Sequence, residues 1–134
     1  MYTRNLLYTD EKFELIAICW NKGHVTPIHD HAGSLCWMAV VQGVMGEEQF
    51  ELKPSKDDST FELKSKRKIT YHPGEIGHIT DEIGVHIIRN VSTGPSITLH
   101  IYAPPIKSCL YYESLLSRAK KRELSFYSAF GSIL

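Results

Sequence analysis

Thr26-Pro27-Ile28-His29-Asp30-His31 is the stretch that decides the architecture of this chain, because it places two histidines two residues apart. Side chains alternate faces along an extended chain, so His29 and His31 point to one side and Asp30 to the other. Two imidazoles on one side can bind the same metal ion. The spacing therefore predicts a metal site carried by a β-strand.

Other residues at fixed distances frame the histidine pair. Gly23 lies six residues before His29, Cys36 lies five after His31, and Gly43 lies seven after Cys36. This frame is similar to the first cupin motif, G-x5-H-x-H-x4-E-x6-G, with a cysteine in place of the glutamate. The resemblance implies a small β-barrel of the cupin jelly-roll type.

The remaining pattern predicts an all-β fold in one domain, residues 1–134. Short β-favouring segments alternate with Gly and Pro, as in sandwiches and barrels. The expected strands are 13–20, 35–41, 47–52, 69–72, 85–91 and 97–103. Alternating glutamates give 47–52 one solvent-facing side, and 53–59 should form a polar loop. The pattern leaves a short helix open for 110–118 and indicates a closing edge strand within 124–130.

Charge and composition argue against several classes of partner. Fifteen basic and fifteen acidic side chains give a net charge of zero, so nothing calls for nucleic acid or an anionic membrane. The basic clusters 64–68 and 118–122 are interpreted as solvated faces. There is no apolar run of membrane-spanning length and no signal-peptide pattern.

The cysteine count bears on the cellular compartment. Cys19, Cys36 and Cys109 cannot all pair within the chain, which favours a reducing, cytoplasmic location. Cys19 and Cys109 are interpreted as small buried hydrophobic residues.

A third metal ligand is expected from a strand well downstream, because two histidines hold a labile divalent metal weakly. His86 is the candidate, since Gly84, His86 and Asn90 match part of the second cupin motif, without its Pro-x-Gly. Three imidazoles suit Fe, Zn, Cu or Ni, so the ligands do not choose the metal. Three neutral ligands would leave the 2+ charge uncompensated, which favours an anionic substrate ligand such as a thiolate.

His100 alternates with Thr98 and Tyr102 along the last clear strand. Buried polar groups need hydrogen-bond partners, so three such groups on one face predict a relay. The other histidines are interpreted as structural or solvated: His24, His72 and His78.

Several further stretches extend the resemblance over essentially the whole chain: Tyr2-Thr3-Arg4-Asn5, Cys19-Trp20, Thr26 to His31, Ser34-x-Cys36, Ile83-Gly84-Val85-His86, Leu99-His100-Ile101-Tyr102-x-Pro104-Pro105 and Ser128-Ala129-Phe130-Gly131. With these, the chain resembles the cysteine dioxygenase family, the mononuclear iron thiol dioxygenases of the cupin superfamily. The resemblance implies oxidation of L-cysteine by O2 to cysteine sulfinic acid, in a protein that acts as a monomer.

The resemblance also implies a role for each matching residue. The Fe(II) ligands are His29, His31 and His86. Arg4 pairs with the substrate carboxylate, for which a planar guanidinium is suited, and Tyr2 stands beside it. Tyr102 is the catalytic tyrosine and also contacts the substrate. Cys36 is joined to it by a thioether in animal members. His100 and Thr98 support the tyrosine by hydrogen bonds.

One departure concerns the N-terminus. Members of the family usually carry a largely helical segment before the Tyr-Thr-Arg-Asn motif, whereas here Met1 directly precedes Tyr2. Chain ends fray by default, so Arg4 and Tyr2 are expected to be poorly held. Two alternatives stay open: a dioxygenase of another small thiol such as 3-mercaptopropionate, and a metal-binding cupin inactivated by the missing segment.

Overall fold

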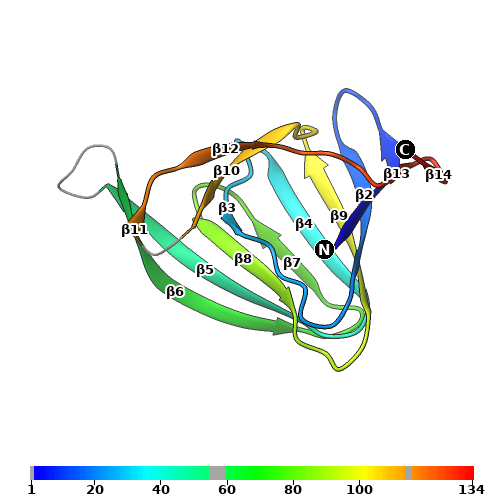
Figure 1. Ribbon diagram of the computed structural model, residues 1–134, viewed down its shortest axis with the longest axis horizontal. Coiled ribbons are helices and arrows are strands. Elements are labelled where there is room, and N and C mark those ends of the chain that lie inside the picture. The colour runs from blue at the N-terminus through cyan, green and yellow to red at the C-terminus, as the bar shows by residue number, and fades with distance from the viewer. Residues whose placement is uncertain (1, 55–59, 114–115) are drawn as a thin grey trace.

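The computed structural model describes residues 2–54, 60–113 and 116–134, and within these ranges it contains strands and no helix (Figure 1). The strands are β1 (Thr3–Thr9), β2 (Glu14–Trp20), β3 (Ile28–His29), β4 (Leu35–Gln42), β5 (Met45–Pro54), β6 (Phe61–Tyr71), β7 (Ile76–Ile79), β8 (Val85–Asn90), β9 (Ser96–Ala103), β10 (Ser108–Tyr112), β11 (Leu116–Ser117), β12 (Lys120–Glu123), β13 (Ser128–Ala129) and β14 (Ser132–Ile133). Over the same ranges, nothing has the helical length and apolar character that crossing a membrane requires.

The strands form two seven-stranded sheets that curve around a common interior (Figure 1). The first sheet has the order β14-β13-β1-β2-β9-β4-β7, and the second has the order β11-β6-β5-β8-β3-β10-β12. Neighbours are antiparallel except β1 and β13, which run parallel. The expected all-β class is confirmed.

The main hydrophobic core lies between the sheets. From the first sheet it takes Ile16, Trp20 and Met38, and from the second it takes Met45 and Ile88. In β2 every second residue is buried, which fits the period of a strand with one face on the core. The strands expected at 13–20, 35–41, 85–91 and 97–103 all form, with no end shifted by more than one residue.

The glutamates expected to give 47–52 one solvent-facing side do not all face solvent. Glu47 and Gln49 are buried, whereas Glu51 is exposed. Strand β5 also runs on to Pro54, and the rest of the expected loop, 55–59, lies outside the described residues. The basic cluster 64–68 is exposed on β6, as predicted.

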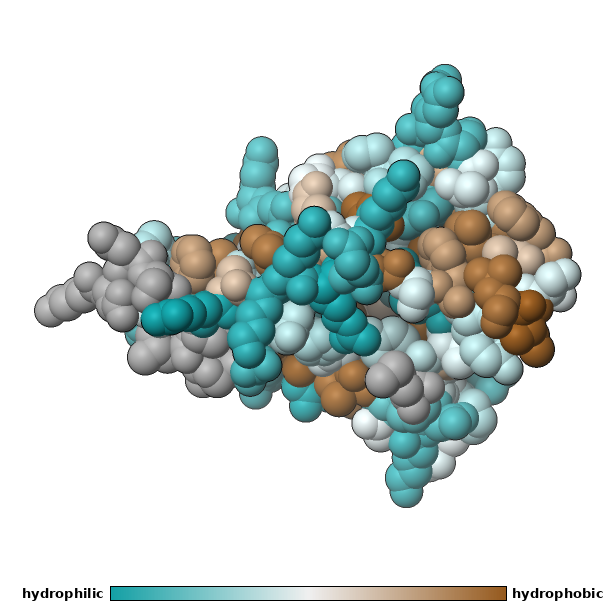
Figure 2. All heavy atoms as spheres, turned by 45° about the horizontal axis from the view of Figure 1, so that its top comes forward, coloured by the Kyte–Doolittle hydropathy of each residue, from teal (hydrophilic) through white to brown (hydrophobic). Residues whose placement is uncertain are grey.

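The C-terminal third differs from the sequence expectation. The helix left open for 110–118 does not form, because β10 pairs with β12 and β3 where the chain is described; residues 114–115 lie outside that part. Within 124–130 only Ser128–Ala129 is a strand. Figure 2 shows mostly hydrophilic side chains on one face and an apolar patch at one end, and the exposed apolar residues of this C-terminal region include Phe130 and Leu134.

The N-terminal residues do not hang free, so the expected fraying was wrong. Strand β1 pairs with β2 along its length and with β13 on its other side. The Tyr127 backbone N–H also donates to the Arg4 carbonyl at 2.7 Å. One partner of β1 is local, the next strand β2, whereas the second partner, β13, comes from far along the chain, where no local sequence pattern reveals it.

Candidate metal centre

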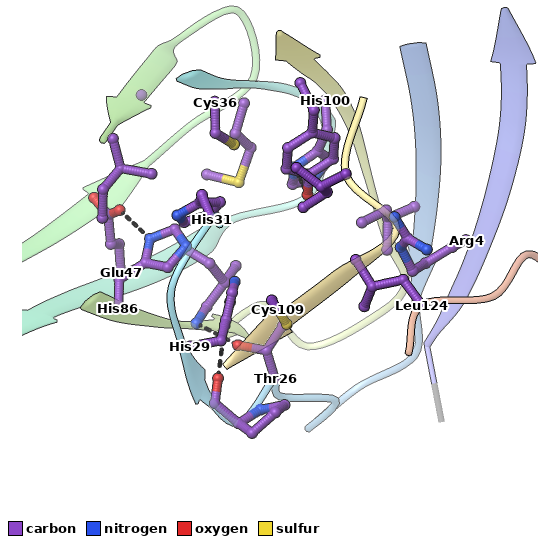
Figure 3. A pocket seen from close by; sticks show the side chains of 18 of the residues that line it. Arg4, Thr26, His29, His31, Cys36, Glu47, His86, His100, Cys109 and Leu124 are labelled. Carbon is purple, nitrogen blue, oxygen red and sulfur yellow. Dashed lines mark hydrogen bonds and ion pairs between the residues drawn. The ribbon is translucent and has the colours of Figure 1, made fainter. Parts of the chain in front are cut away.

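Three histidines converge in the interior. His29 ends β3, His31 follows it, and His86 lies on β8 directly opposite His29 in the antiparallel register. Their ring centroids are 4.6 to 5.1 Å apart, and one possible ligand atom from each lies within 4.8 Å of the others. Figure 3 shows the three rings turned toward a common point. The sequence prediction that these three residues come together is confirmed.

Two of the rings have one nitrogen held and the other left for a ligand. The Nδ1 of His29 donates to the Pro27 carbonyl at 2.8 Å, and the Nδ1 of His86 lies 2.6 Å from a Glu47 carboxylate oxygen (Figure 3). A partner on Nδ1 fixes the tautomer and the ring orientation, which is how metal-binding histidines are commonly held. Both rings therefore offer Nε2 to the centre.

His31 is positioned by its backbone. Its N–H donates to Asp81 at 2.9 Å, and the Gly33 N–H donates to the other oxygen of Asp81 at 2.7 Å. Ala32 and Gly33 have φ values of 49° and 84°, so a tight turn follows His31 directly. Only His29 of the pair belongs to a strand; His31 lies just past its end, where the Asp81 carboxylate and the following turn hold the backbone.

The donor set fits a metal ion. Both ring nitrogens of His31 are buried, and within the described ranges neither has a hydrogen-bond partner. A buried polar atom without a partner is costly, so a ligand is expected there. Burial lowers the pKa of all three histidines, and that of His31 and His86 well below the ordinary value. The rings are thus kept neutral, the form that binds metal.

Glu47 is a site residue that the sequence reasoning missed. One carboxylate oxygen accepts from Tyr71 at 2.9 Å and from Gln49 at 3.2 Å, and the other faces His86. When His86 binds a metal through Nε2, its Nδ1 must donate, so Glu47 is the acceptor. Burial raises the pKa of Glu47, and the hydrogen bonds from Tyr71 and Gln49 offset part of that rise. The three ligands are neutral, as expected from the sequence, and a buried carboxyl group that the sequence reasoning did not include stands one ring away.

A chain of hydrogen bonds runs along the inner side of β9. The Trp20 Nε1–H donates to the Thr98 hydroxyl at 2.9 Å, which lies 2.7 Å from the Nε2 of His100. The Nδ1 of His100 is 3.4 Å from the Tyr102 hydroxyl, a long hydrogen bond. Thr98, His100 and Tyr102 are buried on one face, so the predicted alternation is present.

Cys36 and Tyr102 are direct cross-strand partners of β4 and β9. Both are buried, and the Tyr102 ring stacks at 6.2 Å from the ring of His31. Burial raises the pKa of the Cys36 thiol to about 12 and that of Tyr102 well above its ordinary value. Both groups are therefore protonated at neutral pH in the metal-free protein.

The three histidines line a pocket, and Arg4 on β1 lines the same pocket. Its Nη1 donates to the Ser125 carbonyl at 2.9 Å, and its guanidinium lies 4.9 Å from the centre of the Phe126 ring. Its Nη2 is buried, with no hydrogen-bond partner in the part of the chain that is described. Tyr2 also lines this pocket and packs its ring against Trp20 at 4.8 Å.

Two further pocket residues come from β10 and β12. Cys109 and Arg122 are cross-strand partners that line the same pocket as Arg4 and the three histidines. The interpretation of 118–122 as a wholly solvated face was therefore wrong for Arg122. Cys109 is buried as expected, but Cys19 is exposed.

These features define a class of protein: a β-barrel with a three-histidine metal centre and a guanidinium in the same pocket. The family model for cysteine dioxygenase type I matches residues 1–115. The chain belongs to this family. Cysteine dioxygenase type 1 of Rattus norvegicus is 37% identical over 132 residues, and those of Homo sapiens and Danio rerio are 36% and 34% identical.

The chain spans about two thirds of the length of these relatives. Each alignment covers 97% of this chain but only 64% of the rat and human proteins and 65% of the zebrafish protein.

Solved structures support the cupin jelly roll. A double-stranded β-helix protein from Klebsiella pneumoniae matches with a TM-score of 0.61 at 15% identity, over 81% of this chain and 77% of that one. The Cnp3 cupin domain of Schizosaccharomyces pombe matches with a TM-score of 0.57 at 10% identity, over 78% and 61%. At such identities the likeness establishes the fold, and the expected architecture is confirmed.

Proposed function

We propose that this protein is an Fe(II)-dependent dioxygenase that oxidises L-cysteine with O2 to cysteine sulfinic acid. The observation that carries the proposal is one pocket in which three metal-binding histidines and the free Nη2 of Arg4 are presented together. An amino-thiol acid has donors for the metal at one end and a carboxylate for the guanidinium at the other. Family membership supports the same reaction.

Arg4 would bind the substrate carboxylate. Its Nη1 is already bonded to Ser125 and its stem is held in the paired strand β1, so Nη2 is pre-oriented. A charge-assisted hydrogen bond to a carboxylate satisfies this buried donor, and such bonds are stronger than neutral ones. Tyr2, packed on Trp20, forms the neighbouring wall.

His29, His31 and His86 would hold the metal. When bound, ferrous iron supplies open positions and redox chemistry that bring thiolate and oxygen together. The choice of iron rests on the family, because three imidazoles alone also suit other metals. Glu47 keeps His86 oriented and adds negative charge behind it.

Tyr102 would position the proton that oxygen chemistry needs. The Thr98 oxygen accepts from Trp20. In the His100 tautomer that we propose, the Thr98 hydroxyl donates to Nε2 and the Nδ1–H donates to the Tyr102 oxygen. This leaves the phenol O–H free to point into the pocket. The balance closes without another reductant, since sulfur loses four electrons to O2 and both oxygen atoms end on sulfur.

The test is oxygen uptake by protein loaded anaerobically with Fe(II) and then given L-cysteine in air-saturated buffer. We expect one O2 consumed per cysteine sulfinate formed, with two labelled atoms in the product from ¹⁸O2. Protein loaded with Zn(II) serves as the matched control and should consume none. Stoichiometric iron without oxygen uptake would instead identify a catalytically silent cupin.

A thiol panel tests the substrate. We expect the highest kcat/KM for L-cysteine, because it has both an amine for the metal and a carboxylate for Arg4. A preference for 3-mercaptopropionate, which lacks the amine, would overturn the cysteine assignment and leave a dioxygenase of another thiol.

We also infer a thioether between Cys36 Sγ and the Tyr102 ring, because the two side chains are cross-strand partners. Forming this C–S bond removes two hydrogens, with O2 as the electron acceptor. Intact mass after turnover should be lower by two hydrogens, and a denaturing gel should show a doublet. Cys36→Ser should give one band; a doublet that persists in that variant contradicts the crosslink.

We infer a monomer in a reducing, cytoplasmic compartment. The resemblance to the family supports the monomer, and the free thiols of Cys19, Cys36 and Cys109 support the reducing compartment. Sedimentation should give the mass of one chain, and a dimer would contradict this part of the proposal.

A further inference from the structure

Arg122 is placed differently from the other basic residues of its segment. On β12 it is half-buried, whereas Lys120 and Lys121 are exposed, and Leu124 two residues on is also turned inward. Figure 3 shows Leu124 beside Arg4, and Cys109, the cross-strand partner of Arg122, on the same side of the pocket. The strand period therefore turns Arg122 toward the substrate end.

The charge of Arg122 has no compensating partner among the residues that the structure describes. Lys120 pairs with Glu113 at 2.9 Å and Lys121 with Glu123 at 3.4 Å. For Arg122, by contrast, the described residues provide neither an ion pair nor a hydrogen bond to the side chain. An uncompensated guanidinium at the wall of a pocket attracts an anion.

Tyr2, another residue that lines the pocket, lies within reach of this charge. Burial raises the pKa of Tyr2, and the charges of Arg122 and Arg4 offset part of that rise. The two guanidinium groups thus act on the same volume, Arg4 from the first sheet and Arg122 from the edge strand of the second.

We propose that Arg122 is a second substrate-binding guanidinium, which together with Arg4 makes the pocket select thiols that carry a carboxylate over thiols that do not. The inference rests on the proposed function and adds a specificity residue to it. Two cations that line one pocket favour a carboxylate, which has lone pairs for both. The same pair repels cysteamine, a thiol whose only charge is positive.

The competing explanation is that only the aliphatic stem of Arg122 matters, as packing against Leu124 and Cys109. Two substitutions separate the explanations. Arg122→Met keeps the stem and removes the charge, and Arg122→Lys keeps a charge without the planar fork. Lys121→Met is the matched control, because it removes a charge from the outward face of the same strand.

The experiment measures binding without turnover. Each Fe(II)-loaded protein is titrated under nitrogen with L-cysteine, L-cysteine methyl ester and cysteamine in a calorimeter. For Arg122→Met we expect the Kd of L-cysteine to rise roughly fivefold to tenfold, the size of one partly exposed charge pair, while the Kd of the ester changes less than about twofold. The Lys variant should fall between wild type and Met, and Lys121→Met should match wild type.

Equal L-cysteine affinity in wild type and Arg122→Met would overturn the proposal, as would a wild-type protein that binds the ester as tightly as the acid. An equal loss for acid and ester would assign Arg122 to packing. Oxygen uptake is measured separately on wild type, so a failure of the dioxygenase assignment is seen independently of the binding result.

Discussion

The two sheets of the barrel carry different parts of the site. The second sheet supplies His29, His86 and Glu47, which hold a metal and orient its ligands. The first sheet supplies His100 and Tyr102, members of the hydrogen-bond chain that faces the metal centre. The contrast teaches that metal binding and the handling of protons are built on separate scaffolds, so mutation should separate them.

The largest expected effect is on the second sheet. His86→Ala removes one of three ligands, so metal affinity should fall by more than roughly a hundredfold, since even the outer partners of ligands are worth up to that much. Metal analysis after gel filtration measures this, and oxygen uptake should vanish with the metal. His72→Ala, an exposed histidine paired with Glu75, is the control. Normal iron content in His86→Ala would remove the distinction between the sheets.

A smaller effect on metal affinity is expected for Glu47, the hydrogen-bond partner of the metal ligand His86. In Glu47→Gln an amide NH2 must face Tyr71 and Gln49 or face His86, and all three present donors to the wild-type carboxylate. Metal affinity should fall about tenfold to a hundredfold. Competition with a chelator measures it.

Glu48→Gln is the matched control for that experiment, because its carboxylate lies on the other face of β5, bonded to Ser65. An unchanged metal affinity in Glu47→Gln would show that Glu47 does not orient the ligand.

On the first sheet, mutation should lower the catalytic rate and leave metal binding unchanged. Thr98→Val keeps the shape but leaves Trp20 Nε1–H and His100 Nε2 without their partner. We expect kcat to fall roughly tenfold, the lower end for outer partners of a site, with iron content unchanged. Thr98→Ser, which restores the hydroxyl, should recover most of the rate. Loss of iron in Thr98→Val would mean that the sheets are not separable.

The smallest effect is a pH dependence of stability. Burial lowers the pKa of His100 from 6.5 to about 3, so the folded protein holds it neutral while the unfolded chain is protonated first. Its contribution is complete above the unfolded pKa and is lost as the pH falls, by about 1.4 kcal/mol for each pH unit below it.

Urea unfolding of the metal-free protein between pH 7 and pH 5 measures this slope. The three ligand histidines add to it with the same sign, so the informative quantity is the difference between wild type and His100→Gln. The variant should have the shallower slope, and parallel curves would contradict the buried neutral His100.

The metal ligands could be predicted from the sequence because their signal is local. The spacing of His29 and His31 and the strand around His86 each fit within a few residues of chain. Alternation along 97–103 likewise predicted which side chains of β9 share the inner face, because strand period is a local property.

The missed residues have non-local causes. Glu47 lies in a glutamate-rich segment whose composition is typical of a surface strand. Only the facing His86 and Tyr71 explain why a carboxylate is buried there. Arg122 stands in a basic run, and only its pairing with Cys109 turns it inward. In each case the alternation of side chains along the strand was the available signal. Glu47 lies two residues from the inward-facing Met45, and Arg122 lies two residues from the inward-facing Leu124.

The bond from Arg4 to the Ser125 carbonyl closes a loop of 121 residues. During synthesis on the ribosome, the three histidines emerge well before Ser125 does. The Arg4 guanidinium can therefore be fixed in place only after Ser125 has been synthesised, whereas all three histidines precede that residue in the chain.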